Sequence, residues 1–196
     1  GQWEKSQKYI ERNRQSARLR GDEGFEAAML YWDAIIKLTL GDEGEAITLL
    51  EESASARDEV MMIFDWLIVH GTYGLACCRL GKLDRALEEA RQADRLLSTI
   101  ARPSGAAYIF GYTACVRLFL ELMDQETNHS IHSEIQEMAK RGCKKLNSFV
   151  RIFPVAKPFA LLYQGIYNNL SGDPEKAHVS WEKSLDAAQE FDLDYQ

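Results

Sequence analysis

Two histidines and a glutamate lie close together in the chain at His129, His132 and Glu134. Two imidazoles three residues apart can meet on one face of a helix, which is how some proteins begin a zinc site. A zinc ion needs further protein ligands, however, and Cys143 is too distant along the chain to be assigned as one. We therefore predict no metal ligand and interpret these residues as the polar start of a helix.

The cysteines indicate packing rather than chemistry. Three of the four lie in apolar segments that read as helices, and the adjacent pair must point to different faces of its helix. The four are Cys77, Cys78, Cys115 and Cys143. This usage is typical of reduced cysteine serving as a small hydrophobic residue in the cytosol.

Motifs of known catalytic or cofactor sites are missing from the sequence. It contains no nucleophile elbow, phosphate-binding loop, dinucleotide fingerprint or zinc-protease motif. The two GDEG segments, 21–24 and 41–44, lack the alternating oxygen ligands of a calcium loop and read as turns in which Asp caps the next helix. We predict no catalytic residue and no cofactor, although residues distant in the chain could still form a catalytic pair.

The net charge is −7 at pH 7, but cations gather in two places. Residues 1–20 hold six basic and two acidic residues. The second group consists of Lys140, Arg141, Lys144, Lys145, Arg151 and Lys157. A nucleic-acid site would need a sustained basic face with stacking aromatics, and the acidic balance argues against one. We interpret both groups as solvated helix faces.

No segment predicts a membrane span or a signal peptide. The two most apolar stretches, 60–78 and 106–122, are interrupted by charged residues and contain small residues suited to close packing, so both predict buried helices. The N-terminus is charged and lacks an apolar core region. We expect a cytoplasmic protein without membrane contact.

The elements that must position any site are helices with a recurring spacing. Residues 71–97 predict two helices joined by a turn at Gly81, because Gly readily adopts the left-handed conformation that ends a helix. The pattern is a small residue, Gly seven positions later and Ala five positions after that. It occurs as Gly74, Gly81, Ala86, as Gly165, Gly172, Ala177, and as Ala34, Gly41, Ala46.

The fold class predicted from this spacing is all-α, an α-solenoid of antiparallel helix pairs with about nine helices and little or no sheet. We expect a single domain over 1–196, in which the third pair has lost the spacing and is recognised by length and order. The predicted parts are an N-terminal helix at 2–19 and helix pairs at 24–55, 58–100, 103–152 and 155–192. In the last helix, Ala177, Trp181, Leu185 and Ala188 are expected to face the core.

We call this spacing of Gly and Ala the small-residue ladder. Its three occurrences resemble the tetratricopeptide repeat, a helix–turn–helix unit of 34 residues. The large residue that this family places before the first small position corresponds to Leu30, His70 and Leu161. Its aromatic position in the second helix corresponds to Leu50, Ala90 and Trp181. His70 and Ala90 depart from the family pattern, and the alternative is an ordinary helical bundle with chance matches.

Residues 151–196 also resemble the C-terminal repeat region of large signalling proteins. Those proteins join a class III adenylate or guanylate cyclase domain to a nucleotide-binding ATPase domain and a helical tail. The similar features are FP at 153–154, GDPEKA at 172–177 and WEKSL at 181–185. The resemblance implies a regulatory fragment of a larger cytoplasmic protein, with covalently linked domains and no catalytic residues of its own.

The tetratricopeptide resemblance further implies a concave groove lined by the first helix of each pair. The corresponding residues are Tyr31, Ile35, Leu38, Ile68, Leu75, Arg79, Phe159, Leu162, Ile166 and Asn169. Chaperone-binding members clamp a terminal carboxylate with Lys, Arg and Asn, but only Arg79 and Asn169 are present here, so we predict no such clamp.

The lining is mostly apolar, so it would suit an apolar or amphipathic helix of a protein partner, or it is filled by the fold itself. The function that we expect is a protein–protein interaction scaffold. A sensor that binds a peptide or small ligand in the groove is the alternative, and an enzyme is the least favoured function.

Overall fold

The computed structural model describes residues 3–55, 61–125 and 129–191, except for the side chains of residues 129 and 130. Within these residues the chain forms nine α-helices and no strand, which confirms the all-α prediction. The helices are α1 Trp3–Arg20, α2 Glu23–Leu40, α3 Glu43–Ala54, α4 Ile63–Arg79, α5 Leu83–Thr99, α6 Ile109–Gln125, α7 His129–Val150, α8 Lys157–Leu170 and α9 Pro174–Glu190. Short 3₁₀ turns at Ala106–Tyr108 and Pro154–Ala156 precede α6 and α8.

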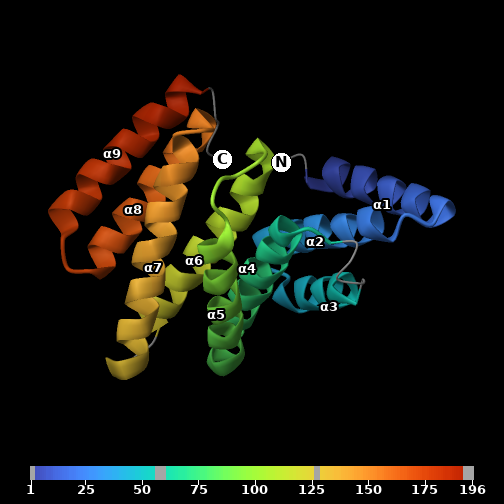
Figure 1. Ribbon diagram of the computed structural model, residues 1–196, viewed down its shortest axis with the longest axis horizontal. Helices are drawn as coiled ribbons and strands as arrows, with labels where there is room; N and C mark the ends of the chain where they lie inside the picture. Colours follow the sequence, from blue (N-terminus) through green and yellow to red (C-terminus); the bar gives the residue numbers. More distant parts are fainter. Residues whose placement is uncertain (1–2, 56–60, 126–128, 192–196) are drawn as a thin grey trace.

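The helices follow one another across the molecule in chain order, from α1 at one end to α9 at the other (Figure 1). Each helix packs against the next one in the sequence. In addition, α2 contacts α4, α4 contacts α6, and α6 contacts α8, so the first helices of the four pairs form one continuous row. The second helices α3, α5, α7 and α9 pack against their own partners beside this row.

The core extends along this row from Ala27 on α2 to Ala160 on α8. Its largest fully buried side chains include Tyr112 and Phe119 on α6 and Phe149 on α7. Among the described residues, the stretch Ala106–Gln125 is long and apolar enough to cross a membrane by length and composition alone. Half of it is buried inside the fold, and the core helix of a soluble protein passes the same test.

The turns between paired helices repeat one local structure. The Asp42 carboxylate accepts a hydrogen bond from the Glu45 amide at 3.2 Å, and the Asp173 carboxylate accepts one from the Lys176 amide at 3.1 Å. The preceding residues, Gly41 and Gly172, both have φ of 84°, a left-handed conformation that strains any other residue. The turn and Asp cap predicted at 41–44 are therefore confirmed, and the turn at Gly172 has the same structure.

A buried hydrogen bond also repeats, and no sequence pattern indicated it. The Ser53 hydroxyl donates to the Ala27 carbonyl at 2.9 Å, and the Ser184 hydroxyl donates to the Pro158 carbonyl at 2.7 Å. Both serines lie twelve residues after the turn glycine of their pair. Each bond ties the second helix to the start of the first, so the two pairs share geometry as well as spacing.

The middle pair reaches the same result with different residues. Ala93 stands where the other pairs have serine, and the Leu67 carbonyl instead accepts a hydrogen bond from the Cys115 thiol at 3.4 Å. This carbonyl lies inside α4, and the thiol of α6 supplies the additional donor that α5 lacks. Cys115 thus ties the second pair to the third.

The small residues of the ladder mark close helix approaches. A Cβ at Gly165 would clash with the Trp181 indole, so this aromatic lies directly on the glycine. At Gly74 the added atom would clash with Leu118 and lie 3.0 Å from the Glu89 Cβ. In the middle pair, Leu118 of α6 thus fills the space beside Gly74 that Trp181 fills beside Gly165. This explains why Ala90, at the position that corresponds to Trp181, is small.

Two helices begin later than predicted. Helix α4 begins at Ile63, because the Asp65 carboxylate accepts a hydrogen bond from the Met62 amide at 2.8 Å and caps the helix there. The predicted start at 58 lies outside the described residues. Helix α6 begins at Ile109, although its pair was predicted to begin at 103, because Gly105 is extended, with φ −158° and ψ 147°.

The predicted buried face of α9 is partly wrong. Leu185 is 60% exposed, whereas Ser184 is buried. The hydrogen bond from Ser184 to the start of α8 fixes the rotation of α9, so its core side contains Ala177, Ala187 and Ala188. Trp181 is half-buried at the edge of this side.

Candidate functional site

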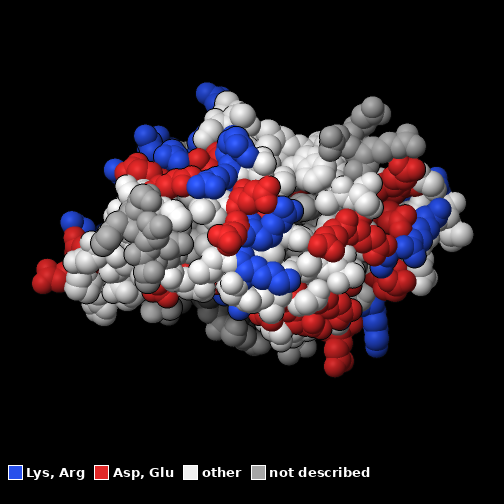
Figure 2. Space-filling model, turned by 90° about the horizontal axis from the view of Figure 1, so that it is seen from below, with Lys and Arg blue, Asp and Glu red and all other residues white. Residues whose placement is uncertain are grey.

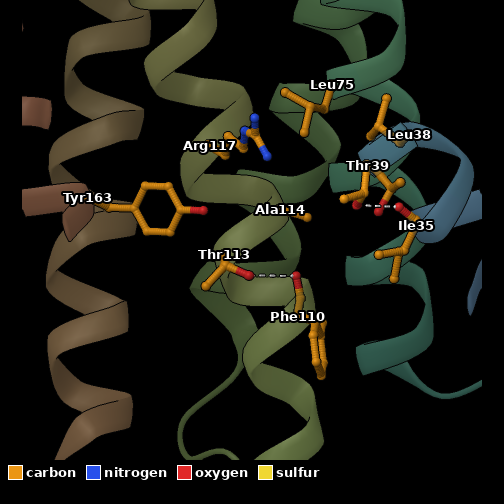
Figure 3. A pocket seen from close by; sticks show the side chains of 10 residues that line it. Ile35, Leu38, Thr39, Leu75, Phe110, Thr113, Ala114, Arg117 and Tyr163 are labelled. Atoms are coloured by element: carbon orange, nitrogen blue, oxygen red, sulfur yellow. Dashed lines mark hydrogen bonds between the residues drawn. The ribbon is translucent and has the colours of Figure 1, made fainter. Parts of the chain in front are cut away.

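Two adjoining hollows lie along the row of first helices. The first, which we call the α2–α6 pocket, has a volume of about 100 Å³. It is lined by Ile35, Leu38, Thr39, Thr72, Leu75, Phe110, Thr113, Ala114, Arg117 and Tyr163. In Figure 3, Tyr163 reaches towards α6 from α8, while Ile35, Leu38 and Thr39 approach from the opposite side on α2.

The second hollow, the α6–α8 groove, has a volume of about 510 Å³. Its lining is Arg117, Leu120, Glu121, Asp124, Leu162, Tyr163, Ile166, Asn169, Leu170 and Trp181. The α2–α6 pocket and the α6–α8 groove share Arg117 and Tyr163, so they join at these two residues. Together they place side chains from α2, α4, α6, α8 and α9 around one depression.

The structure brings six of the ten predicted groove residues to these hollows. Ile35, Leu38 and Leu75 line the α2–α6 pocket, and Leu162, Ile166 and Asn169 line the α6–α8 groove. The other four lie elsewhere. Tyr31 and Ile68 border a separate hollow of about 670 Å³, while Arg79 and Phe159 are not in the lining of any of the three.

The two ends of the depression differ in burial. Leu38 and Leu75, on α2 and α4, are buried in the core, and so are Tyr31 and Ile68 at the separate hollow. The Tyr31 hydroxyl is also engaged, because it donates to the Asp65 carboxylate at 2.8 Å, and burial together with that carboxylate raises the Tyr31 pKa. Leu162 and Ile166, on α8, are only half-buried. The depression is therefore lined by buried leucines at its α2–α4 end and by half-buried side chains at its α8 end.

Helix α6 supplies lining residues that sequence reasoning missed, among them Phe110, Thr113, Arg117 and Leu120. The third helix pair has lost the small-residue ladder, so no position of the repeat could be carried over to α6. The remaining signal was Arg117 in an otherwise apolar stretch. It lies four residues before Glu121, at the spacing of an ion pair on one helix face.

Glu121 forms hydrogen bonds with two arginines near the place where the α2–α6 pocket and the α6–α8 groove join. It accepts hydrogen bonds from Arg117 at 2.9 Å and from two nitrogens of Arg79 at 3.2 Å each. Arg79 also donates to the Leu38 carbonyl at 3.2 Å. The guanidinium of Arg79 is thus used to tie α2, α4 and α6 together at the end of the pocket.

One polar atom in the pocket lacks a partner. The Thr72 hydroxyl is buried, with 2% of the residue exposed, and makes no hydrogen bond within the described part of the chain. Its neighbour in the lining, Thr113, donates to the Ile109 carbonyl at 2.9 Å. An unsatisfied buried hydroxyl lowers stability unless a group in the pocket bonds to it.

Replacing Thr72 with valine is therefore expected to raise the free energy of unfolding by about 1 kcal/mol, because the change removes an unpaired polar group and keeps the shape. Urea denaturation followed by circular dichroism measures the change. The same substitution at Thr113 is the control and should bring no gain, since that hydroxyl already has a partner. A loss of stability in Thr72→Val would mean that water in the pocket satisfies the hydroxyl.

One cluster of titratable groups connects two neighbouring helices. His70 Nδ1 lies 2.6 Å from Glu89 Oε2, and Arg85 Nη2 lies 2.9 Å from Glu89 Oε1. This cluster joins α4 to α5 and lies outside both the α2–α6 pocket and the α6–α8 groove.

Burial raises the pKa of Cys78 and Cys143 to about 12, so both thiols stay protonated at neutral pH and are poor nucleophiles.

No metal centre forms among the described residues, since none of their His, Cys, Asp and Glu side chains make a group of three or more that could hold an ion. The side chain of His129, which opened the zinc hypothesis, lies outside the description. Comparison with protein-family models, curated proteins and solved structures found no match to this chain.

Proposed function

We propose that this chain is an interaction module, an α-solenoid of tetratricopeptide-like helix pairs that holds a segment of a partner protein. The repeated turn at Gly41 and Gly172 and the repeated serine bond at Ser53 and Ser184 support a repeat origin for the first and last pairs. The continuous row of first helices supports a stacked arrangement.

The observation that carries the proposed function is the open end of the depression. Leu162, Ile166, Leu170 and Trp181 are half-buried apolar side chains gathered in one hollow. Polar groups of Asp124 and Asn169 belong to the same lining. An apolar floor with polar groups at its edge suits an amphipathic helix, which offers apolar residues at helical spacing and polar residues on its flanks.

The wider context that we propose is regulatory. The resemblance of 151–196 to the tails of cyclase and ATPase signalling proteins supports a cytoplasmic module joined covalently to such domains, itself without catalytic activity. Sequencing the gene on both sides of the segment tests this. An open reading frame that continues into cyclase or ATPase motifs would support this covalent linkage. A natural start and stop at residues 1 and 196 would contradict it.

A second candidate function, a sensor for a small ligand or a peptide end, is favoured by the unpaired Thr72 hydroxyl in the α2–α6 pocket. A ligand there would insert a small apolar group between Leu75 and Ile35 and bond to the hydroxyl. In that case Thr72→Val would stabilise the free protein and weaken binding at the same time.

The interaction function is tested by selecting helical peptides from a displayed library on the wild-type protein. We expect selected peptides to carry apolar residues at i, i+3 and i+4, and Ile166→Lys to lower their affinity at least about tenfold, because the lysine would place a charge in an apolar contact. Fluorescence anisotropy measures the affinity. Ile166 is only half-buried, so the melting temperature should change little.

The matched control is Leu185→Lys, which makes the same kind of change at an exposed leucine on α9 outside the groove. This variant should bind the selected peptides as wild type does. Equal losses in both variants, or peptides that bind both as well as wild type, would contradict a groove on the α6–α8 side.

A further inference from the structure

A fourth hollow is lined by part of the second basic group. It lies between α7 and α8, has a volume of about 350 Å³, and shares no lining residue with the α6–α8 groove. We call it the α7–α8 hollow. Its lining is Lys140, Cys143, Lys144, Asn147, Ser148, Arg151, Gln164 and Tyr167.

The basic group divides into cations that are engaged and cations that are not. Arg141 forms a two-pronged bond to the Asp94 carboxylate, at 2.8 and 3.2 Å, and Lys145 donates to the Ile100 carbonyl at 2.8 Å. These two residues attach α7 to the α5 side. Lys157 lies 3.2 Å from the Glu190 carboxylate. The interpretation of the whole group as a solvated face is therefore too simple.

The remaining three cations all line the α7–α8 hollow. Lys144 and Arg151 have no ion pair within the described ranges, and Lys140 has only an exposed contact with Glu137 at 3.7 Å. The described lining contains no carboxylate. In a chain with a net charge of −7, three cations around a hollow without an acidic residue form a local positive field.

The spacing of these cations makes them repel one another. Lys140 and Lys144 are four residues apart on α7, and Arg151 follows directly after Val150, the last residue of that helix. Like charges at such spacing destabilise a helix. A bound anion would remove this repulsion, so the apo protein holds an arrangement that a multiply charged ligand would stabilise.

The rest of the lining suits an anion with several oxygens. The Asn147 amide can donate a hydrogen bond to such a ligand, and Tyr167 contributes a half-buried ring with a hydroxyl. The floor includes the buried Cys143. Its thiol is protonated at neutral pH because burial raises its pKa to about 12, so it adds no negative charge.

We propose that the α7–α8 hollow binds a phosphorylated side chain of a protein partner, with Arg151 and Lys144 as its principal contacts and Lys140 at the edge. A phosphoryl group carries nearly two negative charges and three acceptor oxygens, which matches a site of three cations better than a single carboxylate does. The planar guanidinium of Arg151 can bond two of those oxygens at once.

A phosphopeptide fits this hollow better than a nucleic acid. Tyr167 is the only aromatic residue in its described lining, whereas single strands need successive stacking platforms. On the face of the molecule shown in Figure 2, Lys and Arg side chains lie beside Asp and Glu side chains. This site uses residues outside the α6–α8 groove and stands or falls independently of the interaction function proposed above.

The experiment uses a fluorescent pool of short degenerate peptides with a fixed central phosphoserine, phosphothreonine or phosphotyrosine, beside the same pools without phosphate. Binding is measured by anisotropy at constant ionic strength. We expect at least one phosphorylated pool to bind about tenfold more tightly than its unphosphorylated form, and the double variant Lys144→Glu, Arg151→Glu to abolish this difference. Both side chains are exposed, so the variant should keep its circular dichroism spectrum and melting temperature.

The control variant Lys5→Glu, Arg12→Glu makes the same charge change in the other basic group, at exposed positions on α1. It should retain phosphopeptide binding. Equal loss in the control, or equal binding of phosphorylated and plain peptides, would overturn the proposal as a net-charge effect. Pyrophosphate or a single-stranded RNA that binds more tightly than every peptide pool through Lys144 and Arg151 would overturn the assignment to a protein partner.

Discussion

Replacing Phe149 with alanine is expected to lower the free energy of unfolding by about 4 kcal/mol, since truncating a fully buried phenylalanine removes apolar burial and leaves a cavity. No part of Phe149 is exposed. Its ring meets Tyr112 of α6 with centroids 5.0 Å apart and Phe153 at 5.1 Å. The substitution therefore removes the centre of an aromatic cluster that joins α6, α7 and the segment leading to α8.

Urea melts of wild type and Phe149→Ala measure this change. Tyr9→Ala is the control, because Tyr9 is an aromatic residue that is 56% exposed on α1, and its truncation should alter stability by less than about 0.5 kcal/mol. Similar losses in the two variants would mean that the α6–α7 interface is not the core of the fold.

Local signals explain why most helix boundaries could be predicted. Asp173 caps α9 and Pro174 occupies its first position, so the start of that helix depends on two adjacent residues. The start of α4 depends on Asp65 reaching back to the Met62 amide, and a single carboxylate inside an apolar stretch gave no warning of that role. The start of α6 depends on the extended conformation of Gly105, which sequence does not dictate for glycine.

The candidate site was less predictable, because its residues meet only through tertiary packing. The family resemblance assigned Leu162 and Ile166 to a groove, and both line the α6–α8 groove, but the third pair lacks the ladder, so Arg117 could not be assigned. In the middle pair, the Cys115 thiol takes the place of a serine hydroxyl at the Leu67 carbonyl. The contact persists there with different residue types, and periodicity alone cannot detect that.

The partners of surface cations were equally hidden. Arg141 and Lys144 are three residues apart in one basic run, and nothing in their sequence neighbourhood distinguishes them. In the fold, Arg141 faces Asp94 on α5, whereas Lys144 faces the α7–α8 hollow. Which member of a charge run is engaged depends on the helix that packs beside it, and the angular difference between positions 141 and 144 decides the outcome.

The contact between α4 and α6 yields the second large effect. A Cβ added to Gly71 would lie 2.9 Å from the Cys115 backbone nitrogen and 3.0 Å from the Ala114 Cβ. A backbone atom cannot rotate away as a side chain does, so the two helices would have to separate. We expect Gly71→Val to lower the free energy of unfolding by about 3 kcal/mol, at the upper end of the usual range for overpacking.

Gly44→Val separates this clash from the effect of valine on a helix. Gly44 also lies in a helix, α3, and an added Cβ there meets nothing within 4 Å. Valine is slightly better than glycine in a helix, so Gly44→Val should be neutral or stabilising by a few tenths of a kcal/mol. Equal stability of the two variants in urea would show that α4 and α6 are not in close backbone contact.

The contact between α4 and α6 also sets the width of the α2–α6 pocket. Thr72 and Leu75 follow Gly71 on α4 and line this pocket opposite Thr113 and Ala114. If Gly71→Val stays folded, it should therefore lose affinity for the small ligand or peptide end proposed for this pocket, whereas Gly44→Val should keep that affinity.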